Sequence, residues 1–297
     1  MKTTVKEFKR STANRSRLGN VTVFFFLALA GAFMILPMIY LIMQSLKPIE
    51  EIFLFPPRFF VRRPTFNNFF IISFMFEYGW VPFSRYLFNS VMISISVTAG
   101  TVIIGSMAAY PFSKLQFPGK KIIWELIMLA LLFYGGVALS FSRYLVMAGL
   151  KMINTYWAFV LPALAGTLGI FLMRQFMLSI PDEMLESARI DGASEFRIFL
   201  TIAMPQVKPA WLTLVIFAFQ NIWNMTGVVG APGTAGFVYS EELKMLPAAL
   251  AQLASGVMGR TGIGNAAILL MTVPPILIFI LTQNKVMQTM THSGIKG

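Results

Sequence analysis

The sequence contains no cysteine, a single histidine and few charged residues, and each shortage excludes a class of function. Without cysteine there is no disulfide framework, thiol nucleophile or thiolate metal site. His292 has no companions at metal-ligand spacing, so no metal site is expected. Only 12% of the 297 residues are charged, whereas 57% are hydrophobic. Because a mean hydropathy of +0.71 is too high for an ordinary soluble domain, the chain is predicted to lie in a membrane.

Sequence motifs for catalysis are also missing. The chain has no Gly-x-x-x-x-Gly-Lys-Ser/Thr loop for phosphate, and its glycine-rich stretch 256–264 lacks the required lysine. No Ser-His-Asp set and no pair of carboxylates suited to a cleft is apparent. We therefore expect a protein that is not an enzyme, with no catalytic residue and no cofactor of its own.

Acidic residues are scarce beside basic ones, 12 against 24, which gives a net charge of +12. The basic residues are scattered and form no stripe, so nucleic acid is not an expected partner. Membrane proteins retain Lys and Arg in their cytoplasmic loops, which accounts for the excess. The basic stretch 1–20 precedes an apolar run that is too long for a signal peptide, so it is predicted to be a cytoplasmic tail before a first transmembrane helix.

Apolar runs long enough to cross a bilayer, which takes roughly 20 helical residues, recur along the chain. They cover 21–46, 84–112, 121–149, 155–179, 207–228 and 265–287. The fold class predicted is an all-α polytopic membrane protein with six transmembrane helices in a domain over 21–287. Pro37, Pro162, Pro274 and Pro275 are expected to kink these helices without ending them, because neighbouring helices satisfy the freed carbonyls. Both termini, including a tail over 288–297, are expected in the cytoplasm.

The predicted cytoplasmic connection 180–206 contains residues that typically begin and end two short helices. Pro181 suits a first helical position, and Gly192 is a candidate left-handed residue after the helix. A second amphipathic stretch follows from Ala193 to Ala203 and is expected to end at Pro205. We expect these helices, over 181–203, to form a knob that fits a groove on a partner. The alternative is an amphipathic helix lying on lipid, which the local acidity disfavours because inner lipid surfaces are anionic.

The stretch Glu186-Ser-Ala-Arg-Ile-Asp-Gly-Ala-Ser, with Pro205 and Pro209 after it, resembles the coupling-loop signature of ABC importer permeases. The chain departs from that signature at Ser187, where Ala is usual, and at Met204, where Leu is usual. The resemblance implies a type I importer permease fold whose knob docks on separate ATPase subunits. The residues to which it assigns this coupling are Glu183, Glu186, Ser187, Ala188, Asp191, Gly192, Ala193, Phe196 and Pro205.

Further stretches resemble the carbohydrate permeases of the maltose-type G-subunit group. They begin at Tyr86, Asn154, Trp223 and Gly294. The sequence around Ser179 is similar to that of permeases for oligosaccharides, including uronate oligosaccharides. The resemblance implies import of a sugar across a bacterial or archaeal cytoplasmic membrane. The implied partners are a second homologous permease in a heterodimer, two ATPase subunits that bind ATP and Mg, an extracytoplasmic solute-binding protein and membrane lipid.

Polar residues inside predicted spans are candidates for the substrate pathway, because such residues usually face a bundle interior or aqueous path. They are Asn89, Ser90, Gln220, Asn221, Trp223 and Asn224. The alternative is that they join helices by hydrogen bonds. Other functions also remain open: an ABC permease for an amino acid or phosphonate, a membrane scaffold, or a self-contained secondary transporter. The last would need an intramembrane ion site, and none is visible.

Overall fold

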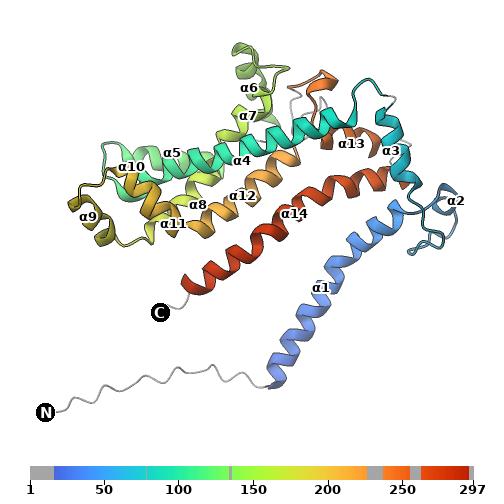
Figure 1. Ribbon diagram of the computed structural model, residues 1–297, viewed down its shortest axis with the longest axis horizontal. Coiled ribbons are helices and arrows are strands. Elements are labelled where there is room, and N and C mark those ends of the chain that lie inside the picture. The colour runs from blue at the N-terminus through green and yellow to red at the C-terminus, as the bar shows by residue number, and fades with distance from the viewer. Residues whose placement is uncertain (1–16, 78, 134–135, 226–236, 255–261, 294–297) are drawn as a thin grey trace.

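The computed structural model describes residues 17–77, 79–133, 136–225, 237–254 and 262–293. The predicted tail before residue 17, the end of the span 207–228, most of the stretch 256–264 and the terminal Gly294–Gly297 therefore lie outside the described residues. Within the described ranges the protein consists of helices, turns and loops without a strand. Figure 1 shows α4, α12 and α14 running alongside one another as an elongated bundle, with α1 diverging from it.

Four described helices are long and apolar enough to cross a membrane. They lie in α1 (Arg17–Ser45), α4 (Phe83–Lys114), α7 (Trp157–Leu164) with α8 (Thr167–Leu178), and α14 (Gly262–Ser293). A fifth is reached only by joining Glu195–Gln206 to α12 (Lys208–Trp223) across an 81° bend. The predicted six spans are therefore not confirmed among the described residues.

The predicted span 121–149 accounts for part of this difference. The structure divides it into α5 (Lys120–Leu132), of 13 residues, and α6 (Gly136–Gly149), of 14 residues. Each is shorter than the roughly 20 residues that a bilayer core requires.

At most positions in the long helices proline does not end the helix, as predicted, and the expected kinks stay a prediction. Pro37 lies within α1, and Pro274 and Pro275 lie within α14. The prediction for Pro162 was incomplete, since α7 ends at Leu164 and the chain resumes as α8 at Thr167. The predicted C-terminal tail 288–297 is also partly helical, because α14 continues to Ser293.

The long connections after the predicted spans 21–46 and 207–228 contain short helices that close one end of the bundle. They are α2 (Ile49–Ile52), α3 (Asn67–Glu77), a 3-10 turn (Glu241–Leu243) and α13 (Leu246–Ala254). Ile72 and Phe76 of α3 pack with Leu250 of α13 in a buried apolar cluster. The Asn68 amide donates to the carbonyls of Ser45 and Lys47, at 2.8 Å each, which ties α3 to the end of α1.

Helix α1 is attached to the remainder of the protein only near that end. Every described side chain from Gly19 to Pro37 is exposed, including Phe24 and Met34 at 73% each, whereas Gln44 and Ser45 are buried. A helix that is apolar on all sides is stable only against lipid or another hydrophobic surface. The exposed length of α1 is therefore the part of the fold most clearly suited to a membrane.

Candidate functional site: a knob at one end of the bundle

The knob consists of residues 182–206, which form α9 and the segments that lead into α12. Helix α9 (Asp182–Ile190) starts one residue later than predicted, with Pro181 as its N-cap. Its end is closed by Gly192, whose φ of +80° lies in the left-handed region. The N–H of Gly192 donates to Arg189 and that of Ala193 to Ala188, both at 3.0 Å, which is the pattern of a Schellman motif. The predicted role of Gly192 in ending this helix is confirmed.

The second part of the knob is longer than predicted. Helix α10 (Glu195–Ile198), capped by the Ser194 hydroxyl, runs into a π-helical turn (Phe199–Ala203) and then α11 (Met204–Gln206). The prediction that Pro205 ends this stretch was wrong. Pro205 lies within α11, inside the continuous helical segment Glu195–Gln206, and the break follows at Val207.

Two polar contacts fix the knob to α4. The Lys114 ammonium lies 2.6 Å from an Asp182 carboxylate oxygen and also donates to the carbonyl of Ile180 at 2.5 Å. Glu195 accepts from the Arg189 guanidinium at 2.6 Å and from the Tyr110 hydroxyl at 2.8 Å. Because Arg189 belongs to α9 and Glu195 to α10, the second contact fixes both helices of the knob relative to each other and to α4.

These contacts shift the acidity of the carboxyls involved. The Arg189 guanidinium holds the pKa of Glu195 below its ordinary value of 4.5, and the Tyr110 hydroxyl acts in the same direction. The hydrogen bond from Lys114 lowers the pKa of Asp182 below its ordinary value of 3.8. Both carboxyls are therefore ionised, and both contacts are formed, throughout the neutral pH range.

Burial separates the side chains that support the knob from those that it presents. Leu185, Ile198 and Phe199 are buried in an apolar cluster with Met173 and Met177 of α8. Of the predicted coupling residues, Ala188 and Ala193 are half-buried. The exposed ones are Glu183, Glu186, Ser187, Asp191, Gly192, Phe196 and Pro205. The knob thus presents an acidic surface supported by a packed base.

Sequence reasoning assigned Phe196, which is 60% exposed, to the presented surface but missed its other apolar members. Ile190 is 86% exposed, Leu200 49% and Met184 44%. Exposed apolar side chains grouped among acidic ones are typical of a protein-binding surface.

At the opposite end of α4, a set of polar residues holds the segment 237–246 by hydrogen bonds. We call this set the clamp, and its members are Arg85, Asn89, Ser90, Asn154 and Tyr156. The Asn89 amide, 1% exposed, donates to the carbonyls of Glu242 at 2.8 Å and Lys244 at 3.0 Å. The Ser90 hydroxyl accepts from the Leu246 N–H at 2.6 Å. Asn89 and Ser90, predicted for the substrate pathway, therefore make internal hydrogen bonds in this structure.

The clamp continues on the segment before α7. The Tyr156 hydroxyl donates to the Asn89 carbonyl oxygen at 2.8 Å, and the Asn154 side chain accepts from the N–H of Ser240 at 3.0 Å. Asn154 has a φ of +59°, a conformation that asparagine tolerates better than most residues. Arg85 adds a bond to the Glu242 carbonyl at 3.3 Å. Sequence reasoning did not assign Arg85 and Tyr156 to any site.

The other pathway candidates lie at the end of α12. Trp223 is 2% exposed, donates from its indole N–H to the Met271 carbonyl at 2.9 Å, and stacks on Phe219 at 5.5 Å. Gln220 is half-buried, whereas Asn221 and Asn224 are exposed. Trp223 therefore joins α12 to α14, and three amides remain at the surface of this helix end. Among the described residues, no group of His, Cys, Asp or Glu is arranged to hold a metal ion.

Comparison with known proteins identifies the family to which the chain belongs. No family model matches the chain. The sn-glycerol-3-phosphate transport system permease protein UgpE of Yersinia enterocolitica is 30% identical over 205 residues, which are 68% of this chain and 70% of that protein. The chain belongs to the carbohydrate ABC importer permease family. The arabinooligosaccharides transport system permease protein AraQ of Bacillus subtilis matches this permease more completely, at 28% identity over 91% of the chain and 96% of that protein.

A solved structure has the same fold as this permease. It is that of a bacterial ABC transporter involved in the import of the acidic polysaccharide alginate. The TM-score is 0.72 at 19% sequence identity, and the match covers 91% of this permease and 98% of that chain. The expected importer permease fold is thereby confirmed, and the permease is a multi-pass membrane protein whose relatives are bacterial.

Proposed function

We propose that this permease imports an oligosaccharide and that its knob is the surface on which a separate ATPase subunit docks. The exposed acidic and apolar residues of the knob carry this proposal, because they are held on a base that packs against α4 and is joined to it by the contacts of Asp182 and Glu195. The orientation proposed places the knob and both termini in the cytoplasm. The ATPase subunits bind ATP and Mg, and the permease transmits their movement.

The remaining partners complete a pathway. A second, homologous permease forms the other half of the pathway, and an extracytoplasmic solute-binding protein delivers the sugar at the end of the bundle that carries the clamp. The amides of Gln220, Asn221 and Asn224 are the pathway candidates best placed to hydrogen-bond sugar hydroxyls, because the Asn89 and Trp223 side chains are used within the fold.

The energetic demand on the knob is considerable. Reversing a 99:1 preference between inward-facing and outward-facing states takes about 5.5 kcal/mol of differential binding. If the knob were loosely attached, it would move without moving α4, and this energy would not reach the transmembrane helices. The ion pair at Asp182 and the contacts at Glu195 supply two separate attachment points, so displacement of the knob displaces α4 as well.

Replacing Phe196 with Ala tests the docking surface directly. Phe196 is 60% exposed, so its loss should leave the fold intact while lowering the amount of ATPase that co-purifies by about tenfold, as expected for an aromatic side chain central to an interface. Phe70→Ala is the matched control, because Phe70 is 70% exposed on α3, at the far end of the bundle. Equal ATPase recovery from Phe196→Ala and wild type would contradict the proposed docking surface.

The cargo is tested separately with the reconstituted importer and its binding protein. Hydrolysis of ATP should be stimulated by oligosaccharides from a panel of neutral and uronate compounds, and not by amino acids or phosphonates. Stimulation by an amino acid alone would replace the cargo while leaving the ATPase-docking surface unaffected.

A further inference from the structure

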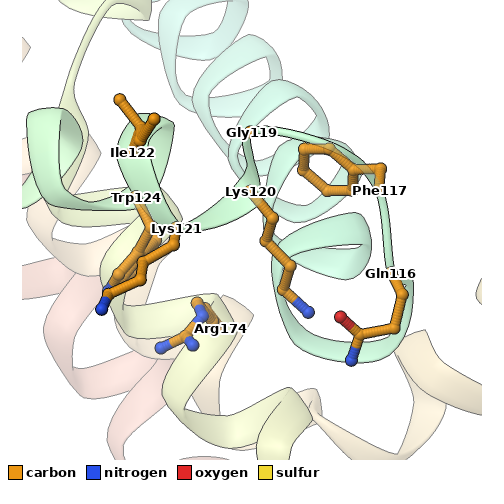
Figure 2. Close-up of a pocket in the computed structure, with 8 residues that line it drawn as sticks. All are labelled: Gln116, Phe117, Gly119, Lys120, Lys121, Ile122, Trp124 and Arg174. Atoms are coloured by element: carbon orange, nitrogen blue, oxygen red, sulfur yellow. The ribbon is translucent and has the colours of Figure 1, made fainter.

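A basic pocket lies where α4, the turn after it, α5 and α8 meet. Its volume is about 620 Å³. The residues lining it are Gln116, Phe117, Gly119, Lys120, Lys121, Ile122, Trp124 and Arg174. Figure 2 shows Lys120 and Lys121, from the start of α5, and Arg174, from α8, among the side chains around this pocket. The pocket is at the knob end of the bundle, because Arg174 also donates to the carbonyl of Phe112 near the end of α4.

The charge of this pocket is of one sign. Lys120, Lys121 and Arg174 line it, and no carboxylate does. None of these three takes part in an ion pair within the described part of the chain, in contrast to the nearby Lys114, which pairs with Asp182. Three uncompensated cations around one hollow favour an anionic ligand.

Two of the cations are held in position. The Arg174 guanidinium lies 4.0 Å from the centroid of the Trp124 ring, and its Nε donates to Phe112 at 3.0 Å. Lys120 donates to the Leu115 carbonyl at 2.7 Å. Lys121 is exposed, and no hydrogen bond of its side chain appears among the described residues. A planar guanidinium fixed on an aromatic ring keeps free N–H groups for a phosphate oxygen.

The backbone adds to the positive electrostatic potential of the pocket. Helix α5 begins directly after Gly119, whose φ is +81°, and no side chain caps its N-terminus. Its first turn contains no acidic residue. The unpaired N–H groups of a first helical turn carry a partial positive charge, which here is directed toward a pocket that already holds three cations.

An apolar track leaves the pocket along α5. Ile122, Leu126 and Leu129 follow one another at spacings of four and three residues, and so lie on one face of the helix. They are exposed at 66%, 60% and 60%. A free phosphate would use the pocket and leave this face uncovered, whereas a phospholipid would place its headgroup in the pocket and its acyl chains along the track.

We propose that the basic pocket binds the phosphate of an anionic phospholipid headgroup. With the orientation proposed above, the lipid belongs to the inner leaflet, where basic pockets between helices recognise anionic headgroups. Lys121 and Arg174 bind the phosphate, Lys120 adds attraction, and the α5 track receives an acyl chain. Lipid bound here contacts both α5 and α8, and α8 leads directly into the knob.

The test measures lipid retained by the purified permease complex. Native mass spectrometry compares added phosphatidylglycerol with phosphatidylcholine of identical acyl chains, and a further sample receives inorganic phosphate. Wild-type protein should retain phosphatidylglycerol preferentially. Lys121→Gln combined with Lys120→Gln should weaken that binding by about tenfold or more, since each basic residue near an anionic surface contributes substantially.

Lys208→Gln is the matched control, because Lys208 is exposed at the same end of the bundle but outside the pocket. It should retain phosphatidylglycerol as wild type does. A shared thermal-melting midpoint among the variants shows that each is folded, and Lys121→Gln alone provides a milder variant that should weaken binding in the same direction.

Equal retention of both lipids, or equal binding by wild type and the double variant, would overturn the proposal. Tight binding of inorganic phosphate that displaces phosphatidylglycerol would overturn the lipid assignment in favour of free phosphate. The assay requires neither ATP nor sugar, so its failure is distinguishable from failure of the proposed transport function.

Discussion

At the knob end of α4, ion pairs between partly exposed side chains hold α9 and α10, whereas at the other end buried amides and hydroxyls hold the segment 237–246. The clamp has satisfied its polar groups internally. The knob presents most of its own to the surroundings, whereas Arg189 and Glu195 pair with each other and the exposed Asp182 pairs with Lys114. A buried hydrogen-bond network is costly to break, while exposed ion pairs contribute little to stability. The comparison indicates that the clamp maintains structure and that the knob is built for contact.

The largest effect is expected from Asn89→Leu in the clamp. Leucine has a similar volume but removes the donor to the carbonyls of Glu242 and Lys244 and the acceptor of the Tyr156 hydroxyl, and only Arg85 still donates to the Glu242 carbonyl and the Tyr156 hydroxyl. Unsatisfied buried groups cost about 1–3 kcal/mol each, so a loss of about 3 kcal/mol is expected in the free energy of unfolding. Thermal melting of the purified permease measures it. Asn221→Leu, at an exposed position of α12, is the control, and an equal loss in both variants would contradict the role given to the clamp.

A smaller effect is expected from Gly192→Val in the knob. A β-carbon at Gly192 would meet no atom within 4 Å, so the cost arises from the backbone alone. A residue other than glycine at a left-handed φ costs roughly 1–2 kcal/mol, and valine is among the least tolerant. ATPase co-purification and sugar uptake should fall more than the melting temperature does.

Gly192→Asn is the companion variant, because asparagine adopts left-handed conformations more readily than valine. It should retain more ATPase and more uptake. If valine and asparagine both behaved as glycine does, the orientation of α10 would not depend on this turn.

The smallest effect is expected from pH, and it distinguishes the two ends of α4. Because the pKa of folded Glu195 is below its ordinary 4.5, its contribution is complete above that value and is lost as pH falls through the lower, folded pKa. Glu195→Gln should therefore be less stable than wild type at pH 7 by less than about 1 kcal/mol, since the pair is partly exposed. Melting curves at pH 7 and in acid should show this difference shrinking. A difference that persisted unchanged in acid would mean that ionisation of Glu195 is irrelevant.

Local signals allowed much of the knob to be predicted. Pro181 and Gly192 act on the residues directly beside them, so the bounds of α9 followed from sequence to within one residue. The attachment of the knob did not, because Lys114 and Asp182 are 68 residues apart and the pairing depends on how α4 and α8 pack. The π-helical turn before Pro205 was missed for a similar reason, since helical spacing alone does not distinguish it from an α-helix.

The polar pathway candidates show a different limit. A sequence identifies an amide within an apolar run, but not whether its partner is a sugar or a carbonyl. For Asn89 the partners are carbonyls more than 150 residues away. For Asn221, which is exposed on α12, the assignment to a substrate pathway stays a prediction. Apolar length was likewise insufficient for the span 121–149, where α5 ends at Leu132.

Helix α1 has a mechanical consequence. It is fixed near Gln44 and Ser45 and is exposed along most of its described length. It is therefore attached to the clamp end of the bundle at one of its two ends. This attachment is closely packed, because a β-carbon at Gly262 would lie 2.3 Å from the Asn68 amide nitrogen and 2.9 Å from the Lys47 carbonyl oxygen. The direction of α1 is thus set by its closely packed contact with the start of α14. The position of the other end of α1 depends on the surface that covers it.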